Sequence, residues 1–147
     1  MDDIVWRKKN WAVWGLITFL AISISTVGIP YLTDSNNIIQ SGFGHHLSDR
    51  PILMYVYFIF GPLALFIGSL NFMPTIRHQN ITFHRWLGRF YVSFCLLGAV
   101  GGFFMALATS AGQIAAAGFT GMAIAWFYTT LKAWFSISSG DFVAHRA

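Results

Sequence analysis

The sequence predicts an all-α integral membrane protein, a bundle of four transmembrane helices with both termini in the cytoplasm. Three observations support this fold class. Hydrophobic residues make up 56% of the chain and charged residues only 10%, whereas a soluble domain carries about 25% charged residues. Four apolar runs are long enough to cross a bilayer, which takes about 20 residues of helix. The basic residues gather on one side of these runs, as in membrane proteins of fixed orientation.

The four apolar runs are expected to form one transmembrane domain that covers residues 1–147. Each run holds at most one charge, and that charge lies near an end, where a long side chain reaches the interface. The segment between the first two runs, residues 30–51, is rich in Asn, Ser, Asp and Gly. We expect it to be a solvated extracytoplasmic loop. The predicted helices cover residues 11–29, 52–72, 86–109 and 113–135.

The distribution of positive charge predicts the orientation. Arg50 lies alone between the first and second runs, and the other eight Lys and Arg residues lie on the opposite side. Because positive residues favour the cytoplasm, both termini are expected there. The eight residues are Arg7, Lys8, Lys9, Arg77, Arg85, Arg89, Lys132 and Arg146.

The net charge of +4 points to lipid rather than to nucleic acid, because the basic residues sit at the ends of apolar runs. The stretch TFHRWLGRFYVSF, residues 82–94, shows this arrangement. Arg85 and Arg89 are four residues apart and share one helix face, and Trp86 lies where an aromatic belt belongs. We predict that Arg85, Trp86 and Arg89 contact anionic lipid headgroups.

Two stripes of small residues, spaced four apart, predict close helix packing within the membrane. The turn between the last two runs is short, so these helices are antiparallel neighbours. We expect the stripes to face inward and to meet; the alternative is that they form the face of a homodimer. The stripes are Gly98, Gly102 and Ala106 in the third run, and Ala117, Gly121 and Ala125 in the fourth.

No catalytic or metal-binding residues are predicted. The chain has no glutamate, and none of its aspartates lies in an apolar run, so a carboxylate proton relay is not encoded. The single cysteine, Cys95, lies in an apolar run and is expected to be a small buried hydrophobe. His45 and His46 are adjacent in the loop, and their spacing does not fit a closed zinc site.

Four blocks of sequence support a family resemblance. In order, they are FGPLALFIGSLNFMP, FHRWLGRFYV, AWFYTTLKAW and DFVAHRA. With this pattern the region from about residue 55 to residue 146 resembles the bacterial membrane-protein family of unknown function designated DUF2306. The resemblance implies a multi-pass helical protein of the bacterial inner membrane, and it implies no reaction.

The chain departs from the family pattern at two places. Family members often have a histidine one turn before the glycine of the second run, where this chain has Tyr57. The family pattern also continues past the final histidine and arginine into further membrane helices, whereas this chain stops at Ala147. We therefore expect a C-terminally shortened member, a fragment or one part of a split protein.

The leading hypothesis is a non-catalytic or accessory membrane protein that binds lipid, a second copy or a membrane partner, without a cofactor. One alternative is a membrane redox component in which His84 and His145 bind b-type haem or quinone, because both histidines lie on the same side of the membrane and precede an arginine. A second alternative is a small transporter or channel subunit, which would need to oligomerise to enclose a pathway.

Overall fold

The computed structural model describes the backbone of residues 2–140 and the side chains of residues 11–140 other than 74, 77 and 78. Within these residues the chain is helical apart from short turns and contains no strand. Four helices are long and apolar enough to span a membrane, so the predicted all-α fold with four spans is confirmed. In chain order the elements are α1 (Asp2–Val27), α2 (Ile29–Thr33), α3 (Ser35–Ile38), η1 (Ile39–Phe43), α4 (Gly44–Asp49), α5 (Pro51–Asn71), α6 (Pro74–Gln79), α7 (Ile81–Leu107) and α8 (Gln113–Ser138).

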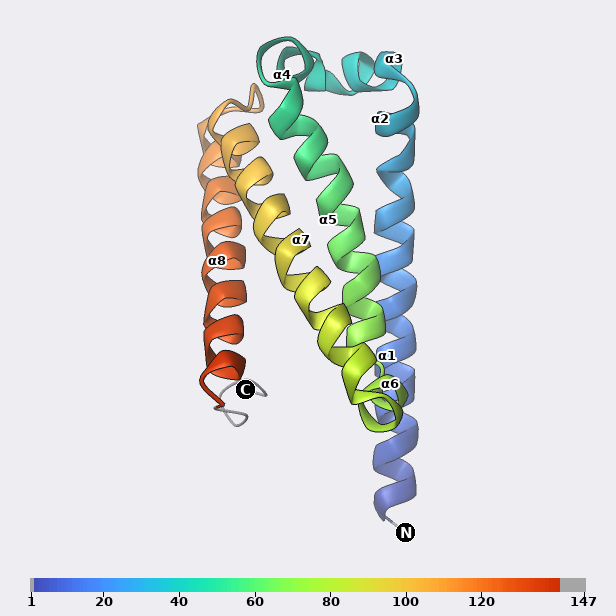
Figure 1. Ribbon diagram of the computed structural model, residues 1–147. Coiled ribbons are helices and arrows are strands. Elements are labelled where there is room, and N and C mark those ends of the chain that lie inside the picture. Colours follow the sequence, from blue (N-terminus) through green and yellow to red (C-terminus); the bar gives the residue numbers. More distant parts are fainter. Residues whose placement is uncertain (1, 141–147) are drawn as a thin grey trace.

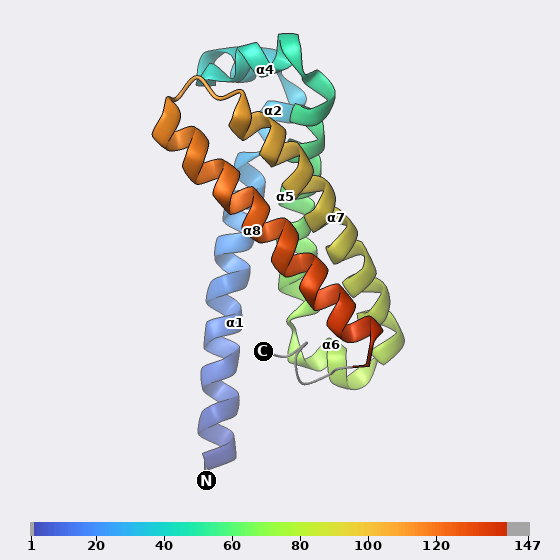
Figure 2. The same ribbon diagram turned by 90° about the vertical axis from the view of Figure 1, so that its left-hand side faces the viewer.

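The four long helices form a row. α5 and α7 pack against each other most extensively, α8 lies on α7, and α1 lies on α5. Figure 1 shows this order from left to right as α8, α7, α5 and α1, and Figure 2 views the row from the α8 end. Each outer helix therefore packs on one long neighbour and leaves a broad face uncovered.

The segment between α1 and α5 is a helical cap over one end of the row (Figure 1). Gly42 has a φ of 87° and turns the chain ahead of α4. Residues with a Cβ atom rarely adopt this backbone conformation. Ile38 and Met54 are fully buried and pack with Phe58 and Met105. The segment is therefore helical and buries Ile38 against α5 and α7, although most of its residues are exposed. Its place outside the cytoplasm stays a prediction.

Few polar contacts hold α1 to α5. The indole nitrogen of Trp14 donates to the carbonyl of Ser69 at 2.9 Å, and the hydroxyl of Ser25 donates to the carbonyl of Pro62 at 3.1 Å. Side-chain hydrogen bonds between membrane helices contribute only about 0.6 kcal/mol each on average. These two bonds therefore fix the register of α1 more than they add to its stability.

The contact between α5 and α7 depends on glycine. A Cβ added to Gly98 would lie 3.3 Å from the backbone nitrogen of Gly61, and one added to Gly101 would lie 2.8 Å from the carbonyl oxygen of Leu53. Because larger side chains do not fit at these distances, the glycines let the two backbones approach closely. This approach makes α5 and α7 the central pair of the row.

The two predicted stripes do not meet within the chain. In the first stripe, Gly98 and Ala106 are buried, and a Cβ added to Gly102 would lie 3.1 Å from the ring of Tyr57 on α5. In the second stripe every residue is exposed: Ala117, Gly121 and Ala125.

A different face of α8 packs on α7. Ala123 and Thr130 are buried, and the ring of Trp126 lies 3.1 Å from where a Cβ on Gly98 would be. Neighbouring residues are about 100° apart around a helix, so Gly121 is about 160° from Ala123 and points away from α7. The prediction that the stripes meet is wrong because the fit of Trp126 against Gly98 turns the opposite face outward.

Candidate functional site

The predicted lipid-headgroup residues lie in the first turns of α7. This helix begins at Ile81, earlier than expected, because the Asn80 side chain accepts a hydrogen bond at 3.0 Å from the backbone nitrogen of Phe83 and caps the helix. All three predicted residues are exposed on the regular helix: Arg85, Trp86 and Arg89.

Arg89 and Trp86 form a cation–π pair. The guanidinium carbon of Arg89 lies 4.8 Å from the centroid of the Trp86 ring, within the range of this interaction. The pair presents a cation and an indole together at the end of the row where α7 begins. This combination suits the membrane interface, and its contact with lipid headgroups stays a prediction.

His84 is half-buried on the same turn of α7. Its proposed partner in a cofactor site, His145, lies outside the described residues. The pairing of His84 with His145 as haem or quinone ligands therefore stays a prediction. Across the described part of the chain, no three His, Cys, Asp or Glu side chains come together as metal ligands.

The cap contains a buried histidine that the sequence did not indicate. His46 is 2% exposed, and its ring lies 3.9 Å from the ring of His45, between centroids. His45 in turn contacts the carbonyl of Ala108 through Nε2 at 3.0 Å. The two histidines thus join the cap to the end of α7.

The surroundings of His46 favour its neutral form. Burial lowers the pKa of His46 below its usual value, and the nearby His45 and Arg50 lower it further, whereas Asp49 opposes them. Nδ1 of His46 is buried without a hydrogen-bond partner. Protonation of this ring would bury a charge that Asp49 offsets only in part, so we expect acid to destabilise the cap.

The uncovered side of α8 carries exposed large apolar side chains and, between them, a line of small residues. A Cβ added to Gly118 or to Gly121 would have no atom within 4 Å. Together with the exposed Ala117 and Ala125, these glycines form a smooth strip along the upper half of the helix. We call the strip formed by Ala117, Gly118, Gly121 and Ala125 the α8 strip.

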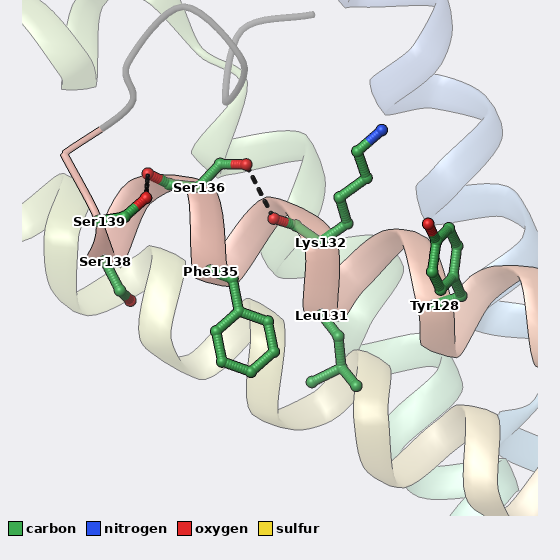
Figure 3. Close-up of a pocket in the computed structure, with 7 residues that line it drawn as sticks. All are labelled: Tyr128, Leu131, Lys132, Phe135, Ser136, Ser138 and Ser139. Atoms are coloured by element: carbon green, nitrogen blue, oxygen red, sulfur yellow. Dashed lines mark hydrogen bonds between the residues drawn. The ribbon is translucent and has the colours of Figure 1, made fainter.

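An open groove of about 760 Å³ continues from the α8 strip toward the end of the helix. Figure 3 shows Lys132 and Ser136 along one edge of this face of α8, with Leu131 and Phe135 along the other. We call it the Lys132 groove. The described residues that line it are Tyr128, Leu131, Lys132, Phe135, Ser136, Ser138 and Ser139.

Comparison with known families identifies the chain. The family model described as a predicted membrane protein, DUF2306, matches residues 54–147. The chain belongs to the DUF2306 family. This match begins in the first turn of α5 and includes α6, α7 and α8. Neither the curated proteins nor the solved structures contain a match to the chain.

Membership in the DUF2306 family agrees with the four apolar helices: the chain is a multi-pass membrane protein. The family description names no reaction or ligand. The surfaces of this chain that bear on its function are the α8 strip and the Lys132 groove.

Proposed function

We propose that this DUF2306 protein is a non-catalytic accessory protein of the bacterial inner membrane that associates with a second copy of itself through the α8 strip. The observation that carries the proposal is the contrast between the uncovered faces of the two outer helices. Lipid-facing surfaces bury large apolar side chains among acyl chains, whereas helix–helix contacts favour small residues.

The uncovered face of α1 matches a lipid-facing surface. It exposes large apolar side chains such as Leu16, Phe19 and Ile24, which are 60%, 67% and 59% exposed. α8 also exposes large apolar side chains, such as Met122 and Ile124, but the α8 strip forms a continuous line of Gly and Ala between them. Since lipid tails gain little contact with so smooth a surface, a second helix satisfies the strip better than lipid does.

The geometry of insertion favours a parallel pair. Two copies of one chain inserted with the same orientation place their α8 helices parallel, so a two-fold axis along the membrane normal puts Gly121 opposite Gly121. Helices that cross at such a contact diverge away from it, at about 40°. Lys132, about three turns further along α8, is then well separated from its counterpart, and repulsion between the two ammonium groups is weak.

We also propose that α1 begins, and α8 ends, on the cytoplasmic side. Arg85, Arg89 and Lys132 lie toward this end of the row, and Arg50 lies beside the cap at the other end. The positive-inside tendency supports this orientation. Reporter domains fused within the cap at residues 34–37 should be active only outside the cytoplasm, and activity inside the cytoplasm would contradict the orientation.

Counting subunits in a bilayer tests the self-association. A cysteine replacing the exposed Ser110 carries one fluorophore per chain, since the native Cys95 is only 1% exposed. In dilute vesicles, single-molecule bleaching should occur in two steps. One-step bleaching at every protein-to-lipid ratio would contradict the proposal, and so would a Gly121→Leu variant that still bleaches in two steps.

A further inference from the structure

The Lys132 groove combines apolar and polar side chains in the order found in a phospholipid. Tyr128, Leu131 and Phe135 supply apolar surface, and the serines lie at the end of the helix (Figure 3). All seven lining residues belong to α8 or to its C-cap, so the groove is an open surface that a lipid can lie along. An acyl chain therefore fits beside Leu131 and Phe135 while a headgroup lies toward the serines.

The depth of Lys132 agrees with this order. α8 has 26 residues, so it is about 39 Å long and exceeds the hydrocarbon core of about 30 Å. Lys132 lies less than two turns before Ser138, the last residue of α8. Its α-carbon is thus near the boundary of the hydrocarbon core, and the ammonium group reaches the phosphate layer.

Lys132 carries its positive charge at this depth. No ion pair joins it to an aspartate among the described residues, and its side chain is exposed. In Figure 3 the ammonium group extends away from the ribbon of α8. An ammonium group at the edge of the hydrocarbon core is stabilised most by a phosphate.

The serines at the end of α8 offer acceptors rather than donors, and Ser136 lies on the Lys132 side whereas Ser138 points to the other side (Figure 3). The hydroxyl of Ser136 donates to the Lys132 carbonyl at 3.0 Å, that of Ser138 to the Trp134 carbonyl at 2.8 Å, and that of Ser139 to the Ser136 carbonyl at 3.0 Å. Each hydroxyl proton is committed to the helix, so only the oxygen lone pairs remain. The groove therefore matches a headgroup with a phosphate for Lys132 and hydroxyl donors for the serines.

We infer that the Lys132 groove binds an anionic phospholipid with a hydroxylated headgroup, phosphatidylglycerol, whose phosphate lies at the Lys132 ammonium and whose glycerol hydroxyls donate to the serine oxygens. Phosphatidylcholine has neither a net negative charge nor headgroup donors. Phosphatidylethanolamine has donors and no net charge. The site is present in one copy of the chain and does not depend on self-association through the α8 strip.

Native mass spectrometry of the full chain in detergent, with phosphatidylglycerol, phosphatidylethanolamine or phosphatidylcholine added, tests the inference. Phosphatidylglycerol should be retained most. Lys132→Gln should reduce its retention about fivefold, the attraction of one basic residue for an anionic lipid, and Lys132→Arg should restore it. Equal retention of phosphatidylglycerol and either other lipid would overturn the inference.

Two variants control for charge and for assembly. Arg50→Gln removes one positive charge beside the cap, away from the predicted headgroup residues, and it should reduce the retention of phosphatidylglycerol less than Lys132→Gln does. An equal loss would mean that only net charge matters and would overturn the site. Gly121→Leu leaves the groove intact, so a monomer of this variant should retain the lipid. Loss of lipid in that monomer would overturn the independence of the site, whereas self-association is judged by subunit counting alone.

Discussion

The two outer helices, α1 and α8, occupy equivalent places in the row and have different uncovered faces. Both pack on one member of the α5–α7 pair, and both are less buried than that pair. Both expose large apolar side chains, such as Phe19 on α1 and Ile124 on α8, and α8 also exposes the glycines and alanines of its strip. Residues exposed in a single membrane chain can therefore serve two purposes. The face of α1 suits contact with lipid, and the α8 strip suits contact with another helix.

The inward attachment of α8 should show the largest effect. Gly98→Leu places a side chain where the Trp126 ring and the Gly61 backbone already lie within 3.3 Å of the Cβ position. Overpacking of this kind costs about 1–3 kcal/mol, so the free energy of unfolding in mixed micelles should fall by that amount. The control is Gly118→Leu on the uncovered face of α8, which should leave the stability of the monomer unchanged. Equal losses would mean that α8 does not pack as described.

The α8 strip should show the next largest effect, on association rather than on folding. Gly121→Leu should weaken the dimer about tenfold, about 1.4 kcal/mol, because the leucine separates the two helices. Energy transfer between labelled chains in vesicles measures this change. Gly15→Leu on α1 is the matched control, since Gly15 also has open space at its Cβ position. If Gly15→Leu weakens the dimer as much as Gly121→Leu, the contrast between the outer helices is wrong.

Acid should loosen the cap, which joins α1 to α5, and leave α8 in place. The pKa of His46 is lowered in the folded chain, so below about pH 6.5 the unfolded chain binds more protons than the folded one. Stability then falls as the pH falls, by at most about 1.4 kcal/mol per pH unit, until the folded pKa is reached. Hydrogen exchange at Ile38, corrected for the slower intrinsic exchange of amides in acid, should show less protection at pH 5 than at pH 7.

A variant separates His46 from the groups around it. His46→Phe keeps a ring beneath the cap and should remove the pH dependence of protection at Ile38. His45, Asp49 and Arg50 remain in this variant. If the dependence persists, one of these three groups is responsible.

The attachment of α1 should show the smallest effect. Trp14→Phe keeps an aromatic ring and removes the hydrogen bond to the Ser69 carbonyl. The loss should be about 0.6 kcal/mol, the average for such bonds between membrane helices. Chemical unfolding of the monomer measures it. A loss as large as that of Gly98→Leu would mean that α1 is held as firmly as α8.

The spans were predictable because an apolar segment long enough to cross the bilayer forms a helix. In a helix all of its backbone hydrogen bonds are satisfied within the segment. The start of α7 was predicted late, although Asn80 ahead of Ile81 and Thr82 is a capping signal that sequence reading can use. The cap was harder to predict. Its short helices have no clear period, and the burial of His46 depends on contacts with residues far along the chain.

Spacing alone could not predict which neighbouring helix each stripe of small residues faces. A spacing of four shows that Ala117, Gly121 and Ala125 share a face of α8, and it leaves open which neighbour that face meets. The fit of Trp126 against Gly98 decides the question, and such fits between distant side chains are set by tertiary packing. The Lys132 groove was missed for a similar reason, because its serines contribute acceptors only once their protons are bonded to the helix.

Disulfide scanning of α8 in native membranes is the most direct test of self-association through the α8 strip. Single cysteines at each position from 114 to 128 are oxidised, and covalent dimers are measured against a scan of α1 over positions 13–24. We predict that cross-linked dimers form from cysteines at Ala117, Gly121 and Ala125 and that their yield is lowest at the buried Ala123. Cysteines on α1 should give no dimers. Uniformly weak cross-linking along α8, or a stronger pattern on α1, would contradict this prediction.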